Sequence, residues 1–482
     1  MPDNDNDNKK ERGKVIPLWD RINSPEEILN SIVTDKNTAL KKMNENHYFI
    51  HSYGGKPAVL SYIYNETFNK KIPDFSTPES IYIRYCNQTV ETIGKNGNIV
   101  SEPLGQWWMK QPGREEFETV AFEPAKNRIY EINNSRILNM WEGFNIEPKK
   151  GNWIKTLKHL YKILYNGDRE KFIYAFKWLA WTIQNPGQRA EVALVLKGKK
   201  GAGKSFFLTQ FVDIFGRHGI CISNPEHLTG KHNAHLQFVS FLFADEAYNP
   251  GNREVEGTLK QIITEPRFTI EPKFINARLT NNCLHIAMST NSDWVIPADA
   301  DERRFFINVV DNKYAKNQSP ESIREKYFND LAKELYKDGG REAMLYDLKN
   351  YQLGDWHPRF NVPHTEELQK QIYMSLSKVE KTIINFIDLG YFPGIKEDDH
   401  HYYITIGELF NYLEEMEPGA KNNNQRMIIN LFEKLELKNV RRNARRVWIF
   451  PPLQVLREKW DDAVFKYNWT YSGEWEIEKQ KY

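Results

Sequence analysis

The chain of 482 residues has little cysteine, little net charge and no long apolar run. Its three cysteines, Cys86, Cys221 and Cys283, are widely separated without metal-ligand spacing, which argues against a zinc site and fits a reducing compartment. The net charge of +2 means that contact with nucleic acid must come from local basic clusters. No run has the length of a membrane span, and residues 1–14 lack the apolar core of a signal peptide. We therefore expect a cytoplasmic protein without membrane association that begins with a disordered tip.

Three zones follow one another along the chain. Residues 15–150 mix short β-rich runs with turn signals, which predicts a small N-terminal α+β domain. Residues 151–315 open with a helical lead-in over 151–187 and continue with buried-strand runs separated by helical or looped segments. This succession predicts an α/β core with a largely parallel sheet.

The last third of the chain changes character again. Residues 316–375 are predicted to form a helical connector, and residues 376–482 are predicted to form a winged-helix-like domain with a tail. Three candidate helices there precede a candidate hairpin around Asn443. The aromatic tail beyond Pro452 receives no assignment from its pattern.

The segment Gly198–Ser205 reads GKKGAGKS and matches the phosphate-loop pattern. The alternative is a chance match in a glycine-rich loop, but an apolar strand run precedes this segment and a helical run follows it. Glycines let backbone N–H groups turn toward phosphates, and the next helix presents its positive N-terminus. The residues expected to bind ATP are Gly198, Gly201, Ala202, Gly203, Lys204, Ser205 and Phe206. Lys204 would contact the β- and γ-phosphates, and the Ser205 hydroxyl would hold Mg²⁺.

Two acidic residues end the apolar run FVSFLFADE. Ligands bind at the carboxyl ends of parallel strands, so Asp245 is a candidate Mg²⁺ ligand and Glu246 a candidate base that orients the attacking water. Alone, such a pair is often a solvated turn. Its position some forty residues after a phosphate loop favours function.

Polar residues also stand at the end of the third apolar strand run and at the start of the fourth. Asn291 ends CLHIAMSTN and would position water against the γ-phosphate, the alternative being an Asx turn. Arg303 and Arg304 start the run RFFINVV, and adjacent strand residues point to opposite faces. One arginine would then be available to a neighbouring subunit's γ-phosphate, whereas a charge-paired surface strand is the alternative.

Two segments are candidates for DNA contact. A hairpin predicted between Arg267 and Leu284 would carry Lys273 and Phe274 at its tip, where a cation and an aromatic ring suit a nucleic-acid strand. The stretch KNVRRNARR holds five basic residues, four of which are arginines on the predicted wing. These are Arg441, Arg442, Arg445 and Arg446. Solvated turns and charged faces are the alternatives for both segments.

The order of four stretches resembles that of superfamily-3 helicases of the AAA+ class, most closely the phage and plasmid primase-helicase group related to poxvirus primase-helicases. The stretches are GKKGAGKS, FLFADEA, GTLKQIITEPRFTIEPK and IAMSTNSDWVIPADADERRFF. The likeness is specific over about Glu191–Val310, and the preceding aromatic segments extend it to about Gln106.

The resemblance implies a P-loop AAA+ core in a homo-oligomeric, hexameric ring. Such a ring hydrolyses ATP with Mg²⁺ between subunits and moves 3′-to-5′ on single-stranded DNA. The residues that it assigns to hydrolysis are Lys204, Ser205, Asp245, Glu246 and Asn291. It matches the trans-acting arginine best to Arg304 and next to Arg303, and it maps the pore hairpin near Lys273.

Many members of this group also carry a primase-polymerase, but residues 15–150 show no paired acidic motif on a strand. A separate primase or polymerase would then be a partner, together with single-stranded or forked DNA. The setting implied is the cytoplasm of a bacterial host, in replication of a phage, plasmid or mobile element.

Four functions follow from these patterns. The leading hypothesis is an ATP-dependent replicative DNA helicase. The second is a non-unwinding, DNA-stimulated ATPase such as a loader, packaging motor or remodeller. The third is a regulatory module in which DNA binding is the function. A small-molecule kinase is the weakest, because no lid or acceptor motif is evident.

Overall fold

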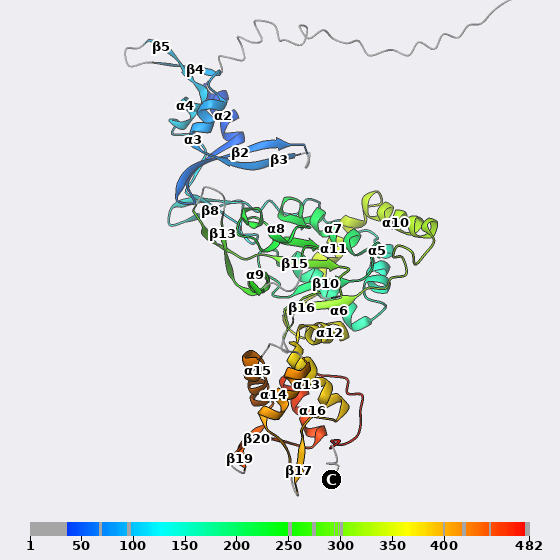
Figure 1. The fold of residues 1–482 in the computed structure, drawn as a ribbon. Coiled ribbons are helices and arrows are strands. Elements are labelled where there is room, and N and C mark those ends of the chain that lie inside the picture. Colours follow the sequence, from blue (N-terminus) through cyan, green and yellow to red (C-terminus); the bar gives the residue numbers. More distant parts are fainter. Residues whose placement is uncertain are drawn as a thin grey trace, which may run out of the picture. The chain divides into compact units, whose positions relative to one another are not determined.

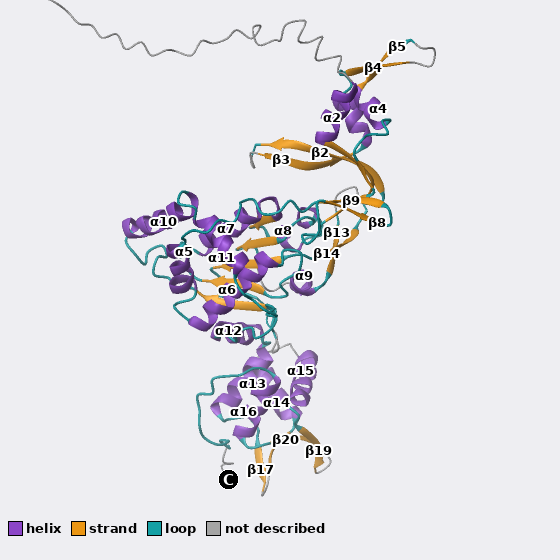
Figure 2. Ribbon diagram, turned by 180° about the vertical axis from the view of Figure 1, so that it is seen from behind, coloured by secondary structure: helices purple, strands orange, loops and turns teal. Residues whose placement is uncertain are grey.

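The computed structural model describes most of the chain (Figures 1 and 2). The described residues are 36–66, 70–93, 98–248, 253–271, 276–293, 295–296, 298, 302–398, 401–416, 421–442 and 445–477. Lys273 and Phe274 lie outside them. The chain forms two compact units, the first of residues 1–121 with 126–140 and the second of residues 122–125 with 141–482. The domain boundaries drawn from the sequence stay predictions.

The first unit combines short helices with small sheets. Its elements are α2 (Lys36–Asn46), β1 (His47–Tyr53), β2 (Lys56–Asn65), β3 (Lys70–Ser76), α3 (Pro78–Arg84), β4 (Thr89–Ile93), β5 (Ile99–Pro103), α4 (Leu104–Met109), β6 (Glu116–Phe117), β7 (Thr119–Ala121), β8 (Ile129–Ile132) and β9 (Ser135–Asn139). The strands form sheets in the orders β3-β2-β1-β6, β4-β5 and β7-β9-β8. Trp107 and Trp108 are buried against Met43 and Val59, so these tryptophans are part of the core.

A five-stranded parallel sheet lies at the centre of the second unit. Its strands are β10 (Ala193–Lys197), β11 (Gly219–Ile222), β12 (Phe241–Asp245), β15 (His285–Thr290) and β16 (Phe305–Val309). Their order in the sheet is β11-β12-β15-β10-β16. The parallel sheet predicted from the sequence is confirmed. The edge strand β11 was not predicted, because its four residues GICI follow the preceding helix directly.

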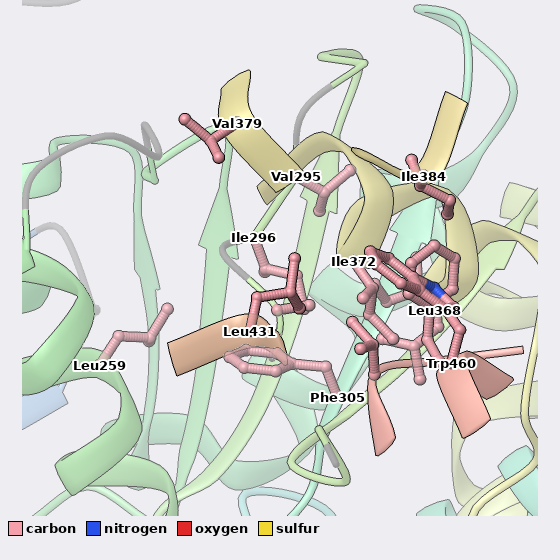
Figure 3. Close-up of a cluster of buried hydrophobic side chains, with 14 of the residues drawn as sticks. Leu259, Val295, Ile296, Phe305, Leu368, Ile372, Val379, Ile384, Leu431 and Trp460 are labelled. Atoms are coloured by element: carbon pink, nitrogen blue, oxygen red, sulfur yellow. The ribbon is translucent and has the colours of Figure 1, made fainter. Parts of the chain in front are cut away.

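Both faces of this sheet are covered, which explains why its strands read as continuous apolar runs. Leu194, Phe243 and Phe306 belong to one buried cluster, together with Trp178 of α6 (Arg169–Gln184) and Phe211 of α7 (Lys204–Phe215). Their sequence neighbours point to the other face, as strand geometry requires. The opposite cluster includes Phe305 of β16, Leu259 of α9 (Arg253–Thr264) and Leu368 of α12 (Glu366–Ser375), and Figure 3 shows these side chains.

Helices of the second unit flank the sheet in Figure 1. They are α5 (Ile154–His159), η2 (Leu160–Leu164, a π-helix), α6 (Arg169–Gln184), α7 (Lys204–Phe215), η3 (Gly216–His218), α8 (Pro225–Thr229), η4 (Ala234–Leu236), α9 (Arg253–Thr264), α10 (Glu321–Tyr336), α11 (Gly340–Asn350) and α12 (Glu366–Ser375). The helical lead-in is interrupted where Asn166 and Gly167 adopt positive φ angles of 53° and 72°. The Asp168 side chain then accepts a hydrogen bond from the Lys171 backbone and caps α6.

The C-terminal part contains the three predicted helices and the predicted hairpin. Its elements are α13 (Lys378–Leu389), β17 (Lys396–Asp398), β18 (His401–Ile404), α14 (Ile406–Met416), α15 (Lys421–Lys434), β19 (Lys438–Arg442), β20 (Arg445–Phe450) and α16 (Leu453–Ala463). β18 adds to the β19–β20 hairpin in a sheet of order β17-β18-β20-β19. The tail that the pattern left unassigned begins as α16, which buries Trp460, and continues to a buried Trp475.

No helix within the described ranges is long and apolar enough to cross a lipid bilayer.

Candidate nucleotide-binding site

A pocket of about 330 Å³ lies where β10, β12 and β15 end. It is lined by Lys200, Gly201, Ala202, Gly203, Lys204, Ser205, Phe206, Asp245, Glu246, Ser289, Asn291 and Phe328. The segment Gly198–Ser205 connects β10 to α7, as its pattern predicted. Five residues proposed for ATP hydrolysis, drawn from three separate stretches of sequence, therefore meet at the carboxyl edge of one parallel sheet.

Glycines allow the loop to curl at this edge. Gly201 and Gly203 have φ angles of 83° and 95°, which side-chain-bearing residues rarely adopt. A Cβ atom on Gly203 would lie 2.5 Å from Cε1 of His159. Space and backbone conformation thus both require glycine at position 203.

The Lys204 side chain folds back over this loop, and the residue is only 5% exposed. Its Nζ donates to the carbonyl oxygens of Gly198 (2.5 Å) and Lys199 (3.0 Å) and to Oδ1 of Asn291 (3.0 Å). Burial lowers the pKa of the ammonium group, while the Glu246 and Asp245 carboxylates oppose that shift. A cation held here faces the space above the N-terminus of α7, where an anion is favoured.

Oxygen atoms gather beside the first turn of α7. The Ser205 hydroxyl donates to Oδ1 of Asp245 at 3.0 Å and lies 3.5 Å from Oγ of Ser289. The Ser289 hydroxyl also donates to that Asp245 oxygen. Mg²⁺ prefers oxygen ligands and uses one or two carboxylates together with phosphate oxygens. Ser205 and Asp245 therefore fit Mg²⁺ bound with a nucleotide.

Glu246 and Asn291 form the far wall of the pocket. The Asn291 amide donates to Oε1 of Glu246, and its carbonyl oxygen accepts from Lys204. Glu246 has a φ angle of 54°, an uncommon value for a residue with a side chain. Such strained backbone clusters at functional sites. The arrangement aims a carboxylate into the pocket and fixes its direction through Asn291.

Several residues in or directly behind the pocket were missed by sequence reasoning. Ser289 lies two residues before Asn291 on β15, and this period of two was the available signal. Phe328 comes from α10, more than a hundred residues beyond the loop, and no local pattern marks it. His159 packs against Gly203, and burial lowers its pKa to about 4, so the ring is neutral near pH 7.

Arg303 and Arg304 do not line this pocket. The carbonyl oxygen of Arg304 accepts from the backbone N–H of Ala193, which begins β10, whereas the loop follows the other end of that strand. The two ends of β10 are separated by roughly 13 Å at the rise of a strand. The Arg304 guanidinium lies 3.4 Å from the buried carboxylate of Glu302, which Lys260 approaches to 3.7 Å. Arg303 is exposed.

The hairpin predicted for DNA contact is present as β13 (Arg267–Ile270) and β14 (Arg278–Asn281), which pair antiparallel. Its tip residues Lys273 and Phe274 lie outside the described residues, so their role stays a prediction. Within the described arms, Asn233 accepts from Glu271 N–H at 2.9 Å and donates to the Thr269 carbonyl at 2.8 Å.

The four wing arginines face each other across the β19–β20 hairpin. Arg441 is directly opposite Arg446, and Arg442 is opposite Arg445. Arg441 and Arg446 line a groove of about 700 Å³ together with Glu433 of α15 and Trp448. Like charges directly opposite one another destabilise a hairpin. The opposed arginines therefore repel one another, and the Glu433 carboxylate lines the same groove.

Comparison with known proteins shows which structures share this fold, but it assigns no activity to the chain. Residues 196–304 match a family of unknown function (DUF5906). No curated protein matches the chain. Three solved structures of the NrS-1 C-terminal region are similar. The apo structure of residues 305–718 has a TM-score of 0.59 at 16% identity and covers 86% of this chain and 99% of that one.

Two A-form apo structures of the same region give the same result. Their TM-scores are 0.58 and 0.56 at 16% and 17% identity, and both alignments cover 86% of this chain and 98% of the other. At this level of identity the likeness shows a shared fold only.

Proposed function

We propose that this chain is an ATP-dependent DNA helicase of the superfamily-3 kind. The observation that carries the proposal is the convergence of Lys204, Ser205, Asp245, Glu246 and Asn291 on one pocket. The β15 strand, which carries Asn291 beyond its end, lies between β10 and β12, so the amide stands between the phosphate loop and the acidic pair. A chance match of the phosphate-loop pattern alone would not place the acidic pair and Asn291 beside the loop.

Each residue has a distinct task in hydrolysis. Lys204 and the loop amides bind the phosphates and compensate charge that develops in the transition state. Ser205 and Asp245 hold Mg²⁺, which supplies charge neutralisation at the phosphate oxygens when it is bound. Glu246 accepts the proton of the attacking water, and Asn291 keeps that carboxylate oriented.

The position of Arg304 supports action between subunits. Its backbone sits at the end of the sheet opposite the pocket, so the side chain cannot serve its own nucleotide. A head-to-tail ring brings one face of a subunit against a different face of the next. An arginine supplied by a neighbour then stabilises the γ-phosphate in the transition state.

We expect two inactive variants to complement each other. Lys204→Ala subunits retain Arg304, and Arg304→Ala subunits retain an intact pocket. In an equal mixture about a quarter of the interfaces combine the two intact halves, so ATPase activity returns to about that fraction of wild type. Steady-state hydrolysis measured against mixing ratio tests this.

Arg303→Ala serves as the matched control in the same mixture. If Arg303→Ala is the inactive variant that complements Lys204→Ala while Arg304→Ala stays active, Arg303 is the trans-acting residue. No recovery with either arginine variant, in particles shown to mix, would contradict the shared site.

The C-terminal part supplies a DNA-binding surface in this proposal. The order α13, β18, α14, α15 and a β19–β20 hairpin, with β18 joining that hairpin, is the arrangement expected of a winged helix. Opposed arginines on the wing favour phosphate contacts, which give affinity without base readout.

The double change Arg441→Ala with Arg446→Ala should weaken DNA binding without regard to sequence. Each lost phosphate contact reduces the slope of log K against log salt by about 0.9 for duplex DNA, so the slope should fall by nearly 2. Fluorescence anisotropy at several salt concentrations measures it. Lys333→Ala with Lys337→Ala removes the same charge from α10 and should leave the slope unchanged; equal slopes in both double variants would refute the wing contact.

Separation of a 3′-tailed duplex in the presence of Mg²⁺ and ATP tests the helicase proposal. We expect single-stranded DNA to stimulate hydrolysis and the duplex to separate. Stimulated hydrolysis without separation would instead support the second candidate, a loader, packaging motor or remodeller, which the same pocket and wing favour. The substrate proposed is single-stranded or forked DNA, the assembly a hexamer, and the setting replication of a phage, plasmid or mobile element in a bacterial cytoplasm, with a separate primase or polymerase.

A further inference from the structure

A buried polar network joins α12 to the segment that carries Asn291. Gln371 of α12 is 0% exposed. Its Oε1 accepts from the backbone N–H groups of Val295 (2.6 Å) and Ile296 (3.4 Å), and its Nε2 donates to the carbonyl of Asp293 (2.8 Å). One amide therefore holds three backbone positions of the described segment that follows β15.

A second pair closes the network at the phosphate loop. Lys197, the last residue of β10, donates through Nζ to Oε1 of Glu367 at 2.9 Å and to the carbonyl of Asp293 at 3.1 Å. Gln371 Nε2 donates to the same Glu367 oxygen at 2.7 Å. The Lys197 and Glu367 side chains are only 14% and 7% exposed. The side chain of Asp293 is 93% exposed and its Oδ1 lies 3.4 Å from Lys197 Nζ, so Asp293 meets Lys197 through both its carbonyl oxygen and its exposed carboxylate.

The network contacts two segments that form the pocket, the start of the phosphate loop and the residues after β15. Lys197 directly precedes Gly198, whose N–H donates to the Thr290 carbonyl at 3.1 Å. Asn291 follows Thr290 and contacts both Lys204 and Glu246. Asp293 comes two residues later and receives hydrogen bonds from both Lys197 and Gln371. The position of Asn291 is thus set between the pocket on one side and α12 on the other.

We infer that Gln371 and Glu367 are positioning residues for ATP hydrolysis, acting through the Asn291 segment. This inference rests on the proposed ATPase function. Neither residue lines the pocket, so neither contacts nucleotide. The buried Gln371 amide has all its hydrogen-bonding groups paired, so only one orientation of it suits the site. Such an amide fixes the position of the backbone after Asn291 more closely than apolar contacts would. α12 ends at Ser375, and Ser377 caps α13, so a single residue separates these two positions. The helix that carries the network therefore leads directly into the C-terminal part.

Gln371→Glu tests the inference, because it keeps the shape and exchanges a donor for an acceptor. The new oxygen would face the Asp293 carbonyl and the Glu367 carboxylate, both of which repel it. We expect kcat for ATP to fall about tenfold or more through misplacement of Asn291, with KM within about twofold, since the phosphate loop is unaltered. The same substitution at Gln369 on α12, which makes none of these contacts, should leave both constants at the wild-type value.

A swapped pair separates positioning from general loss of structure. Glu367→Gln combined with Gln371→Glu preserves composition and charge and lets an amide donate to the new carboxylate, so it should recover part of kcat, while the repulsion by the Asp293 carbonyl remains. If Gln371→Glu does not fold, Glu367→Gln alone carries the test, with a lower kcat and an unchanged KM expected.

A wild-type kcat in Gln371→Glu, or KM and kcat changing together, would overturn the inference. A wild-type protein that does not hydrolyse ATP would overturn the proposed function instead, so the two failures are distinguishable.

Discussion

Replacing Lys204 with alanine should reduce ATP hydrolysis by a factor on the order of 10² to 10³, the effect of removing one preorganised charge from a transition state. The ammonium is buried and held by the Gly198 and Lys199 carbonyls, so it is already directed over the loop before nucleotide arrives. No other described lysine makes these contacts to the loop carbonyls. Water that fills the space left by the side chain would carry no positive charge to stabilise the transition state.

Steady-state hydrolysis with and without single-stranded DNA measures this effect. Lys337→Ala, which removes an exposed lysine at the end of α10, is the matched control and should keep full activity. Circular dichroism checks that Lys204→Ala still folds, since the lysine also makes internal hydrogen bonds. A folded variant with more than half of the wild-type rate would refute the assigned role, and with it the proposed ATPase site.

Glu246→Gln should abolish turnover while nucleotide binding survives. A general base contributes on the order of 10² to 10⁴ to a rate, and glutamine cannot accept the proton. Glutamine keeps the carbonyl oxygen that accepts from Asn291, so the wall of the pocket is preserved. The left-handed backbone conformation at position 246 costs glutamate and glutamine about the same free energy. We therefore expect the substitution to leave the stability of the fold unchanged.

Thermal unfolding with Mg²⁺ and ATP distinguishes this variant from Lys204→Ala. Ligand at a hundred times its Kd stabilises a folded protein by about 2.7 kcal/mol, so Glu246→Gln should keep the upward shift in Tm that Lys204→Ala loses. Glu265→Gln, an exposed carboxylate beyond α9, is the control for the substitution itself. Wild-type turnover in Glu246→Gln would mean that another group takes the proton.

The candidate site was largely readable from sequence because its parts are local. A phosphate loop needs glycines and a lysine in fixed order, and an acidic pair needs only to end a buried strand. Asp245 and Asn291 end neighbouring parallel strands, so the prediction that they meet followed from strand direction alone. Arg304 was harder, because the role proposed for its side chain requires a neighbouring subunit.

The residues that only the folded structure identified come from distant segments. Phe328 joins the pocket from α10, His159 backs Gly203 from α5, and Gln371 reaches the Asn291 segment from α12. A glutamine in an amphipathic helix carries no sign of such a role, since the same pattern describes a solvated surface. The edge strand β11 was hidden for a related reason, because four residues give no periodicity to read.

The sequence by itself determined the parallel sheet, the loop that ends β10 and the acidic pair that ends β12, because steric and hydrogen-bonding rules act over a few neighbouring residues. The tertiary structure alone decided which side chains back that loop, how Glu246 is oriented through Asn291, and that Arg304 lies at the far end of the sheet. Those relations depend on strand order and on packing between segments that are far apart in the sequence, and no local pattern encodes either.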